Sequence, residues 1–180
     1  MTPEFTPLGL RRVARTSFLT VERTYVLGPR GGWVVRDIVR HPGSVVVVPW
    51  HDGRFWFIRQ YRAPVGRHVL ELPAGKLDVR GEPPEDSARR ELVEEIGMAA
   101  GTLTRLTAVY PSPGFTDEVS HIFLAEHLTP VGAEPHGLEE ASAELVTLTA
   151  LEAEAALRAG AIDDATTAVG LCSALARLSR

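Results

Sequence analysis

The chain has 180 residues, of which 44% are apolar and 23% are charged, and its net charge is −4 at pH 7. This length suits one domain with a substantial core, and the acidic balance argues against an extended nucleic-acid-binding surface. The single cysteine, Cys172, excludes an internal disulfide and fits a reducing compartment. The N-terminus lacks a signal-type apolar segment, and the apolar run 45–48 is too short to span a membrane. We therefore expect a cytoplasmic protein that binds neither nucleic acid nor membrane.

The first half of the chain predicts β-structure. Apolar runs bounded by turn residues indicate strands, here at 18–27, 33–39, 44–49, 54–60 and 68–72. The Gly- and Pro-rich segment 28–32 and the Asp52-Gly53 pair predict hairpin turns between neighbouring strands. The continuous β-branched run in 44–49 is typical of a strand buried on both faces.

The stretch 71–98, ELPAGKLDVRGEPPEDSARRELVEEIGM, predicts a turn, a loop and then a helix. Pro83 and Pro84 suit a helix start, and a glycine at position 97 suits a left-handed helix stop. Residues three and four apart share a helical face, so three carboxylates in about one turn can converge; these are Glu91, Glu94 and Glu95. Such a group is often a solvated surface, but a hard divalent cation with oxygen ligands would offset its repulsion.

This stretch resembles the Nudix box, G-x5-E-x7-R-E-U-x-E-E-x-G-U, where U is a bulky aliphatic residue. The matching residues are Glu82, Arg90, Glu91, Leu92, Glu94, Glu95, Gly97 and Met98. One departure is that Gly75 lies seven residues before Glu82, so the loop 76–81 is one residue longer than in the motif. A surface loop accommodates one extra residue at small entropic cost, and the helix positions are unaffected.

The second half predicts strands at 103–110, 118–126 and 143–148, with a loop at 111–117, and helices at 150–159 and 165–178. Asp163 and Asp164 offer N-terminal caps for the last helix. This order predicts an α+β fold, an α/β/α sandwich around a mixed β-sheet flanked by helices, which is also the fold that the resemblance implies. The resemblance further implies two parts, a 1–40 antiparallel β unit that embraces a second subunit in a homodimer and a 41–180 hydrolase domain.

The resemblance implies roles for the box residues. Glu91 and Glu95, four residues apart, are the leading metal ligands, and Glu94 is a third candidate that also counts among the catalytic residues. The main-chain carbonyl of Ala74 is implied as a further ligand, with Mg²⁺ as the ion and Mn²⁺ as an alternative. The motif position of Arg90 implies that it orients carboxylates of the box, with Glu82 as a candidate partner through a charge-assisted bond. The remaining motif residues have structural roles, namely Gly75, Glu82 and Gly97.

A general base for the attacking water is implied to lie outside the box. In similar enzymes that cleave ADP-ribose, it is a glutamate on a loop after the box, and the segment 137–141 fits that loop. Glu139 is the first choice and Glu140 the second. The alternative is that both are solvated loop residues.

Three segments outside the box resemble the ADP-ribose pyrophosphatase subfamily. They are FIRQYRAPVG followed by ELPAG, a proline in SPGFTDE that lies 16 positions after Gly97, and RDIV before HPG. The resemblance, which covers residues 20–175, implies that Arg62 binds phosphate, Arg36 acts across the dimer, Trp33 stacks on adenine, and Phe115 and Glu118 contact the terminal ribose. Alternatively, the arginine at position 62 lies on a polar sheet edge and the tryptophan in an interface core.

The leading hypothesis is therefore metal-dependent hydrolysis of ADP-ribose to AMP and ribose 5-phosphate. A second hypothesis is a Nudix hydrolase for another small nucleoside diphosphate compound, such as GDP-mannose, NADH or a diadenosine polyphosphate. A third is a non-catalytic ADP-ribose-binding module. The complete set of box carboxylates and the lack of residues for a DNA-binding domain count against this third reading.

Overall fold

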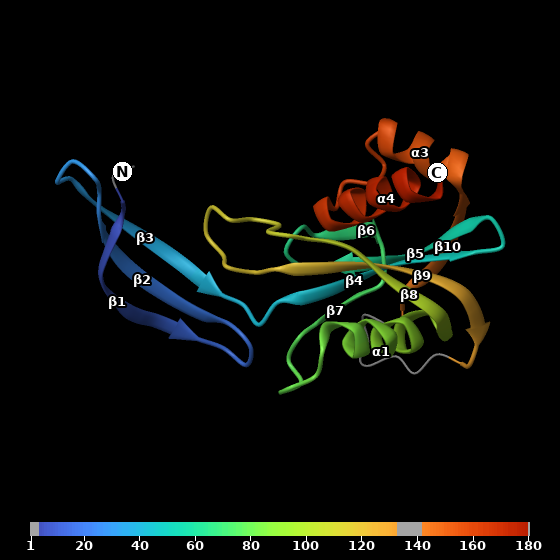
Figure 1. Ribbon diagram of the computed structural model, residues 1–180, viewed down its shortest axis with the longest axis horizontal. Coiled ribbons are helices and arrows are strands. Elements are labelled where there is room, and N and C mark those ends of the chain that lie inside the picture. The colour runs from blue at the N-terminus through green and yellow to red at the C-terminus, as the bar shows by residue number, and fades with distance from the viewer. Residues whose placement is uncertain (1–3, 133–141, 180) are drawn as a thin grey trace. The chain divides into compact units, whose positions relative to one another are not determined.

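The computed structural model describes residues 4–132 and 142–179 (Figure 1). Contacts between residues divide the chain into two compact units. One contains the chain up to Gly43 together with Tyr110–Val119, and the other contains Ser44–Val109 and the chain from Ser120 onward. No helix in the described ranges is long and apolar enough to cross a membrane.

The first unit is a three-stranded antiparallel sheet in the order β1-β2-β3. Its strands are β1 (Thr6–Arg15), β2 (Thr20–Leu27) and β3 (Trp33–Arg40). The Gly-rich turn joins the second and third strands as a hairpin, as the sequence predicted, with Leu27 opposite Trp33. All ten residues of β1 are exposed.

The segment Tyr110–Val119 joins the first unit by pairing with the end of β3. The amide of Val39 donates to the carbonyl of Phe115 at 2.7 Å, and the amide of Asp117 donates to the carbonyl of Val39 at 3.3 Å. The Asp117 carboxylate accepts from Arg40 Nη1 at 3.0 Å and from the amide of His41 at 2.9 Å. A segment that the sequence predicted only as a loop is therefore fixed to the strand by main-chain and side-chain bonds.

The second unit is built on a mixed seven-stranded sheet in the order β10-β5-β4-β9-β8, with β6 paired to β5 and β7 paired to β4. Its strands are β4 (Ser44–His51), β5 (Arg54–Arg62), β6 (Arg67–Glu71), β7 (Ala74–Lys76), β8 (Met98–Val109), β9 (Ser120–Pro130) and β10 (Glu144–Thr149). The pairing of β4 with β9 is parallel and the others are antiparallel.

Within the described ranges, three helices cover this sheet, with α1 (Pro84–Ile96) on one face and α3 (Ala150–Arg158) and α4 (Ala165–Leu178) on the other (Figure 1). The four valines from Val45 to Val48 are at most 2% exposed. Alternate valines enter the two cores, since Val45 and Val47 pack with Leu92 of α1, whereas the other two pack with Leu171 of α4. The predictions of a mixed sheet between helices and of a central strand buried on both faces are confirmed.

The helix ends follow the local signals in the sequence. Gly97 ends α1 with φ of 69°, the left-handed conformation that glycine tolerates. Asp164 caps α4 by accepting from the amide of Thr167 at 2.7 Å. Thr149 caps α3 in a reciprocal arrangement with Glu152.

Several strand boundaries differ from the sequence-based prediction, and β1 was not predicted as a strand. Residues 74–76 form β7 where a turn was expected, because β4 pairs with β5 only at Trp50 and His51 and its first residues need another partner. The strand predicted at 103–110 begins at Met98, directly after the helix stop.

Candidate active site

The helix α1 places the box residues against the sheet. Its buried face carries Ser87, Ala88, Glu91, Leu92 and Ile96. Most of these are apolar or small, so they pack on the valines of β4. The carboxylate of Glu91 is thereby held at the boundary between the helix and β7.

Gly75 makes this approach of helix and strand geometrically feasible. A β-carbon at position 75 would lie 1.9 Å from Cδ and 2.0 Å from Oε1 of Glu91. Real side chains do not tolerate such a distance, so glycine is required here for space. The structural role predicted for Gly75 would therefore be to leave the space that the Glu91 carboxylate occupies.

Arg90 binds three of the box carboxylates. Its Nη1 donates to Glu91 Oε1 at 2.7 Å and to Glu94 Oε2 at 2.9 Å. Its Nε and Nη2 donate to the two oxygens of Glu82 at 3.2 and 3.1 Å. These bonds to Arg90 hold the pKa of the Glu82 carboxyl below its ordinary value. The bonds to Glu82, together with the charges of Glu91 and Glu94, outweigh burial and raise the pKa of the guanidinium.

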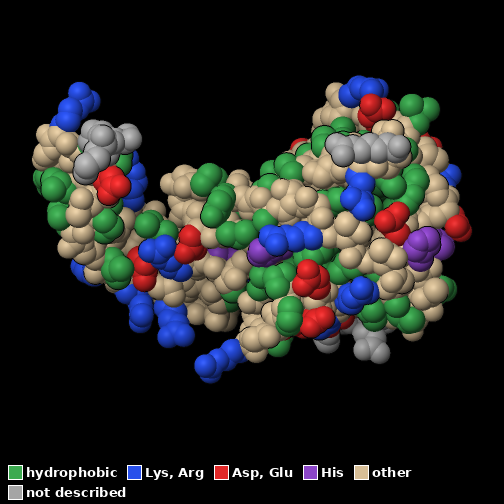
Figure 2. All heavy atoms as spheres, in the orientation of Figure 1, with side chains coloured by type: hydrophobic (Ala, Val, Ile, Leu, Met, Phe, Trp, Pro, Cys, Tyr) green, Lys and Arg blue, Asp and Glu red, His purple; other side chains and the backbone are tan. Residues whose placement is uncertain are grey.

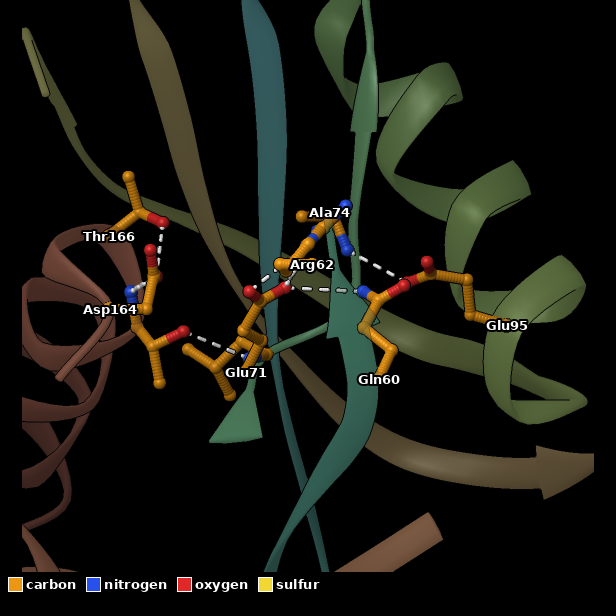
Figure 3. A network of polar contacts seen from close by, with 9 residues as sticks. Gln60, Arg62, Glu71, Ala74, Glu95, Asp164 and Thr166 are labelled. Atoms are coloured by element: carbon orange, nitrogen blue, oxygen red, sulfur yellow. Dashed lines mark hydrogen bonds and ion pairs between the residues drawn. The ribbon is translucent and has the colours of Figure 1, made fainter. Parts of the chain in front are cut away.

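Glu95 points to the strand rather than to Arg90. Its Oε2 accepts a hydrogen bond from the amide of Ala74 at 2.8 Å (Figure 3). Ala74 was predicted to bind the metal through its carbonyl. Its N–H also orients Glu95, which was predicted as a carboxylate ligand. Helix α1 and strand β7 are joined at the point where both would supply oxygens.

The donor set fits a hard divalent cation by its chemistry. Carboxylate oxygens and a main-chain carbonyl are the ligands that Mg²⁺ and similar ions bind. Among residues 4–132 and 142–179, no three Asp, Glu, His or Cys side chains form a group arranged to hold a metal ion. Oxygens of Glu91 and Glu94 face Arg90 instead, so the single convergence point expected from helical spacing is not formed in this arrangement of side chains.

Arg62 lies in a second polar network beside this helix, at the end of β5 (Figure 3). Its Nε and Nη2 donate to Glu71 at 3.0 and 2.6 Å. Gln60 Nε2 also donates to Glu71, at 3.2 Å. Burial lowers the pKa of the Arg62 guanidinium, but the bonds and charge of Glu71, with a further contribution from the charge of Glu95, outweigh it and raise the pKa.

Sequence reasoning missed Glu71 and Gln60 as part of the site. The available signal was a glutamate inside the otherwise apolar run Val69-Leu70-Glu71-Leu72, where a charge is expected only if it has a partner. Its partner, Arg62, is nine residues away and is reached across the β5–β6 pair.

The remaining residues predicted to contact the substrate lie in the first unit. Trp33 is 64% exposed and contacts Tyr25 with ring centroids 6.4 Å apart. Arg36 is exposed and donates to the carbonyl of Val35 at 2.8 Å. These two predicted substrate residues are three apart on one strand, so they project from opposite faces of the sheet and would meet different groups of any ligand or partner.

The segment paired to β3 carries the other two predicted contacts. Phe115 is 55% exposed. Glu118 Oε1 lies 3.8 Å from Nδ1 of His41. The two predicted bases, Glu139 and Glu140, lie outside the described residues.

The profile of the NUDIX domain matches residues 39–166. The chain belongs to the Nudix family. An ADP-ribose pyrophosphatase of Bacillus subtilis is 41% identical over 144 residues, covering 79% of this chain and 77% of that protein. An ADP-ribose pyrophosphatase of Mycobacterium tuberculosis is 40% identical over 139 residues, covering 77% of this chain and 67% of that protein. The crystal structure of an ADP compounds hydrolase matches with a TM-score of 0.87 at 25% identity, covering 98% of this chain and 95% of that one.

The family and the fold expected from the sequence are thus confirmed. As a Nudix hydrolase, the chain is an enzyme that acts on small nucleotide compounds with a divalent cation. The box residues described above match the family motif and lie mainly on α1 and β7.

Proposed function

We propose that this Nudix hydrolase cleaves the diphosphate linkage of ADP-ribose to give AMP and ribose 5-phosphate. The observation that carries the proposal is that Arg62 lies close enough to α1 for the charge of Glu95, a box carboxylate, to act on its guanidinium (Figure 3). A diphosphate needs both a cation and guanidinium donors for its oxygens. Two relatives of about 40% identity bear the name ADP-ribose pyrophosphatase.

Glu91 and Glu95 would hold the cation, with Glu94 and the carbonyl of Ala74 as further ligands. We infer Mg²⁺ as the physiological ion and Mn²⁺ as a substitute, because both accept oxygen ligands. When bound, the cation supplies positive charge that offsets the charge on the diphosphate oxygens in the transition state. Arg90 holds Glu91 and Glu94 in place through the bonds described above.

The chemical step balances with one water. The water oxygen forms a bond to one phosphorus, the bond from that phosphorus to the bridging oxygen breaks, and the other phosphate leaves with the bridging oxygen and the electron pair of the broken bond. The proton of the water passes to a general base, for which we propose Glu139 first and Glu140 second. Arg62 donates to a diphosphate oxygen and so binds the charge that persists through the reaction.

We further propose a homodimer in which the first unit of one subunit serves the other. In that arrangement Arg36 contacts phosphate, Trp33 stacks on adenine, and Phe115 and Glu118 contact the terminal ribose. Exposed apolar side chains of β1, namely Leu8, Leu10 and Val13, support an interface. Figure 2 shows hydrophobic and basic side chains next to one another on this unit. A dimer of this kind, with a single cysteine, suits a cytoplasmic enzyme.

The test is phosphate-coupled turnover with a panel of compounds, with Mg²⁺ and with a chelator. The panel contains ADP-ribose, GDP-mannose, NADH and a diadenosine polyphosphate. We expect a metal-dependent rate whose kcat/KM is highest for ADP-ribose. A higher kcat/KM for another compound would replace the proposed substrate and keep the reaction class. No turnover of any compound would contradict the proposed activity and favour an ADP-ribose-binding module.

A further inference from the structure

The carboxylate of Glu71 is buried, 7% exposed, at the end of strand β6. A buried charge is unfavourable unless it is paired and hydrogen-bonded. Glu71 is both paired and hydrogen-bonded, because its carboxylate accepts hydrogen bonds from Nε and Nη2 of Arg62 and from the side-chain amide of Gln60. Gln60 is itself buried, and within the described residues every buried side-chain nitrogen and oxygen has a partner.

Stability alone does not explain this pair. A buried ion pair gains little over apolar residues of similar size, because removing both charges from water offsets their attraction. Apolar side chains surround the position, including Val69 on the same strand and Ile58 opposite Glu71. A leucine or methionine would suit the packing, so the carboxylate at position 71 points to a need for fixed geometry.

Glu71 fixes the orientation of the Arg62 guanidinium. Glu71 binds the edge formed by Nε and Nη2. Within the part of the chain that the structure describes, Nη1 makes no hydrogen bond, and the side chain of Arg62 is 40% exposed. A planar guanidinium held along one edge presents its remaining N–H groups in one direction.

The Arg62 side chain lies on the same face of the sheet as α1. Ile58, Gln60 and Arg62 alternate onto one face of β5, and Ile58 packs in the same core as Leu92 of α1. The charge of Glu95 acts on Arg62, which places the guanidinium within electrostatic reach of the box carboxylates.

We propose that Glu71 is a positioning residue for the substrate diphosphate. It holds Arg62 by one edge so that the free edge donates to a diphosphate oxygen, and Gln60 fixes Glu71 in turn. This proposal rests on the proposed function, since it requires a diphosphate substrate. It goes beyond that function by assigning a role to a residue that does not itself touch the substrate.

The test is a double-mutant cycle of Arg62→Ala and Glu71→Gln, read as kcat and KM for ADP-ribose. Loss of a charge-assisted bond of this kind corresponds to roughly a tenfold rise in KM for Glu71→Gln. We expect kcat to change less than KM. We expect the double variant to be no worse than Arg62→Ala alone, because Glu71 acts only through Arg62.

Two controls separate positioning from folding. Glu154→Gln removes the same charge from the exposed Arg158–Glu154 pair on α3 and should leave KM unchanged. Inhibition by adenosine, which lacks phosphate, should be the same in Glu71→Gln and wild type. If Glu71→Gln does not fold, Glu71→Asp keeps the charge, shortens the side chain and should raise KM to a smaller extent.

The proposal is overturned if the two single losses multiply in the double variant, if KM does not change, or if adenosine inhibition weakens equally. If wild type prefers another compound of the panel, the proposed substrate fails, and the same cycle with that diphosphate still tests Glu71. If no compound is turned over, calorimetric ADP-ribose affinity replaces KM in the cycle. Equal affinities of Glu71→Gln and wild type would then overturn the proposal.

Discussion

The carboxylate of Glu91 occupies the place that a side chain at position 75 would fill. The distance from an ideal β-carbon at Gly75 to Glu91 Cδ is 1.9 Å. Strand β7 and helix α1 can therefore approach this closely only because position 75 has no β-carbon.

Replacing Gly75 by alanine should displace Glu91 and lower both stability and activity. Overpacking of this kind destabilises by about 1–3 kcal/mol, and we expect kcat to fall more than that loss of folded protein explains. Thermal unfolding and turnover at saturating Mg²⁺ measure the two effects. Gly32→Ala is the matched control, because nothing lies within 4 Å of its added β-carbon. Unchanged activity of Gly75→Ala would contradict the close approach.

Glu95→Gln should abolish most turnover without unfolding the protein. The amide oxygen still accepts the N–H of Ala74, so the contact between helix and strand remains, but the charge that would bind the cation is lost. We expect kcat to fall by about two orders of magnitude and the unfolding temperature to stay close to that of wild type. Glu85→Gln, an exposed position in the first turn of α1, is the control. Near-normal turnover of Glu95→Gln would remove Glu95 from the ligand set.

The pair of Glu82 with Arg90 should make stability depend on pH in the acidic range. Arg90 lowers the pKa of Glu82 in the folded state, whereas the unfolded chain has the ordinary value of 4.5. The contribution of the ionised Glu82 to folding stability is complete above the pKa that Glu82 has in the unfolded chain. It is lost as pH falls through the lower pKa of the folded state, because the unfolded chain binds the proton at higher pH than the folded one. Urea unfolding of wild type and Glu82→Gln should differ near neutral pH and converge on acidification. A gap that stays constant with pH contradicts this linkage.

Glu139→Gln and Glu140→Gln should differ strongly in turnover. Only the base accepts the proton of the attacking water, and a positioned general base contributes about 10²–10⁴-fold to rate. We expect kcat to fall for Glu139→Gln and to change little for Glu140→Gln, with the same KM for both. The reverse result would exchange the two roles, and equal small effects would place the base elsewhere.

Aspartates at Leu8 and Leu10 should dissociate the proposed dimer. Both leucine side chains are exposed, at 60% and 61%. Burying a charge in an interface is unfavourable without a partner. Light scattering should give a dimer for wild type and a monomer for the double variant. Leu151→Asp, at an exposed leucine of α3, should remain dimeric; a monomeric wild type would refute the cross-subunit roles of Arg36 and Trp33.

Local rules predicted most secondary structure of the second unit. The proline pair and Gly97 set the ends of α1, and Asp164 set the start of α4, because capping depends on neighbouring residues alone. Helical spacing placed Glu91, Glu94 and Glu95 on one side of α1. The motif position of Arg90 implied that it orients box carboxylates, but helical spacing alone did not show that Glu91 and Glu94 would face Arg90 instead of converging with Glu95.

Periodicity and a fixed motif were enough to predict the box helix, the buried central strand and the Nudix family from the order of residues alone. Which distant segments meet became clear only from the folded chain. Ser44 bonds to Ser120 across 76 positions in the parallel β4–β9 pair, and Glu71 reaches Arg62 across an antiparallel pair. Such contacts depend on how strands are ordered and registered in the sheet, and long-range packing sets that order rather than any signal between neighbouring residues.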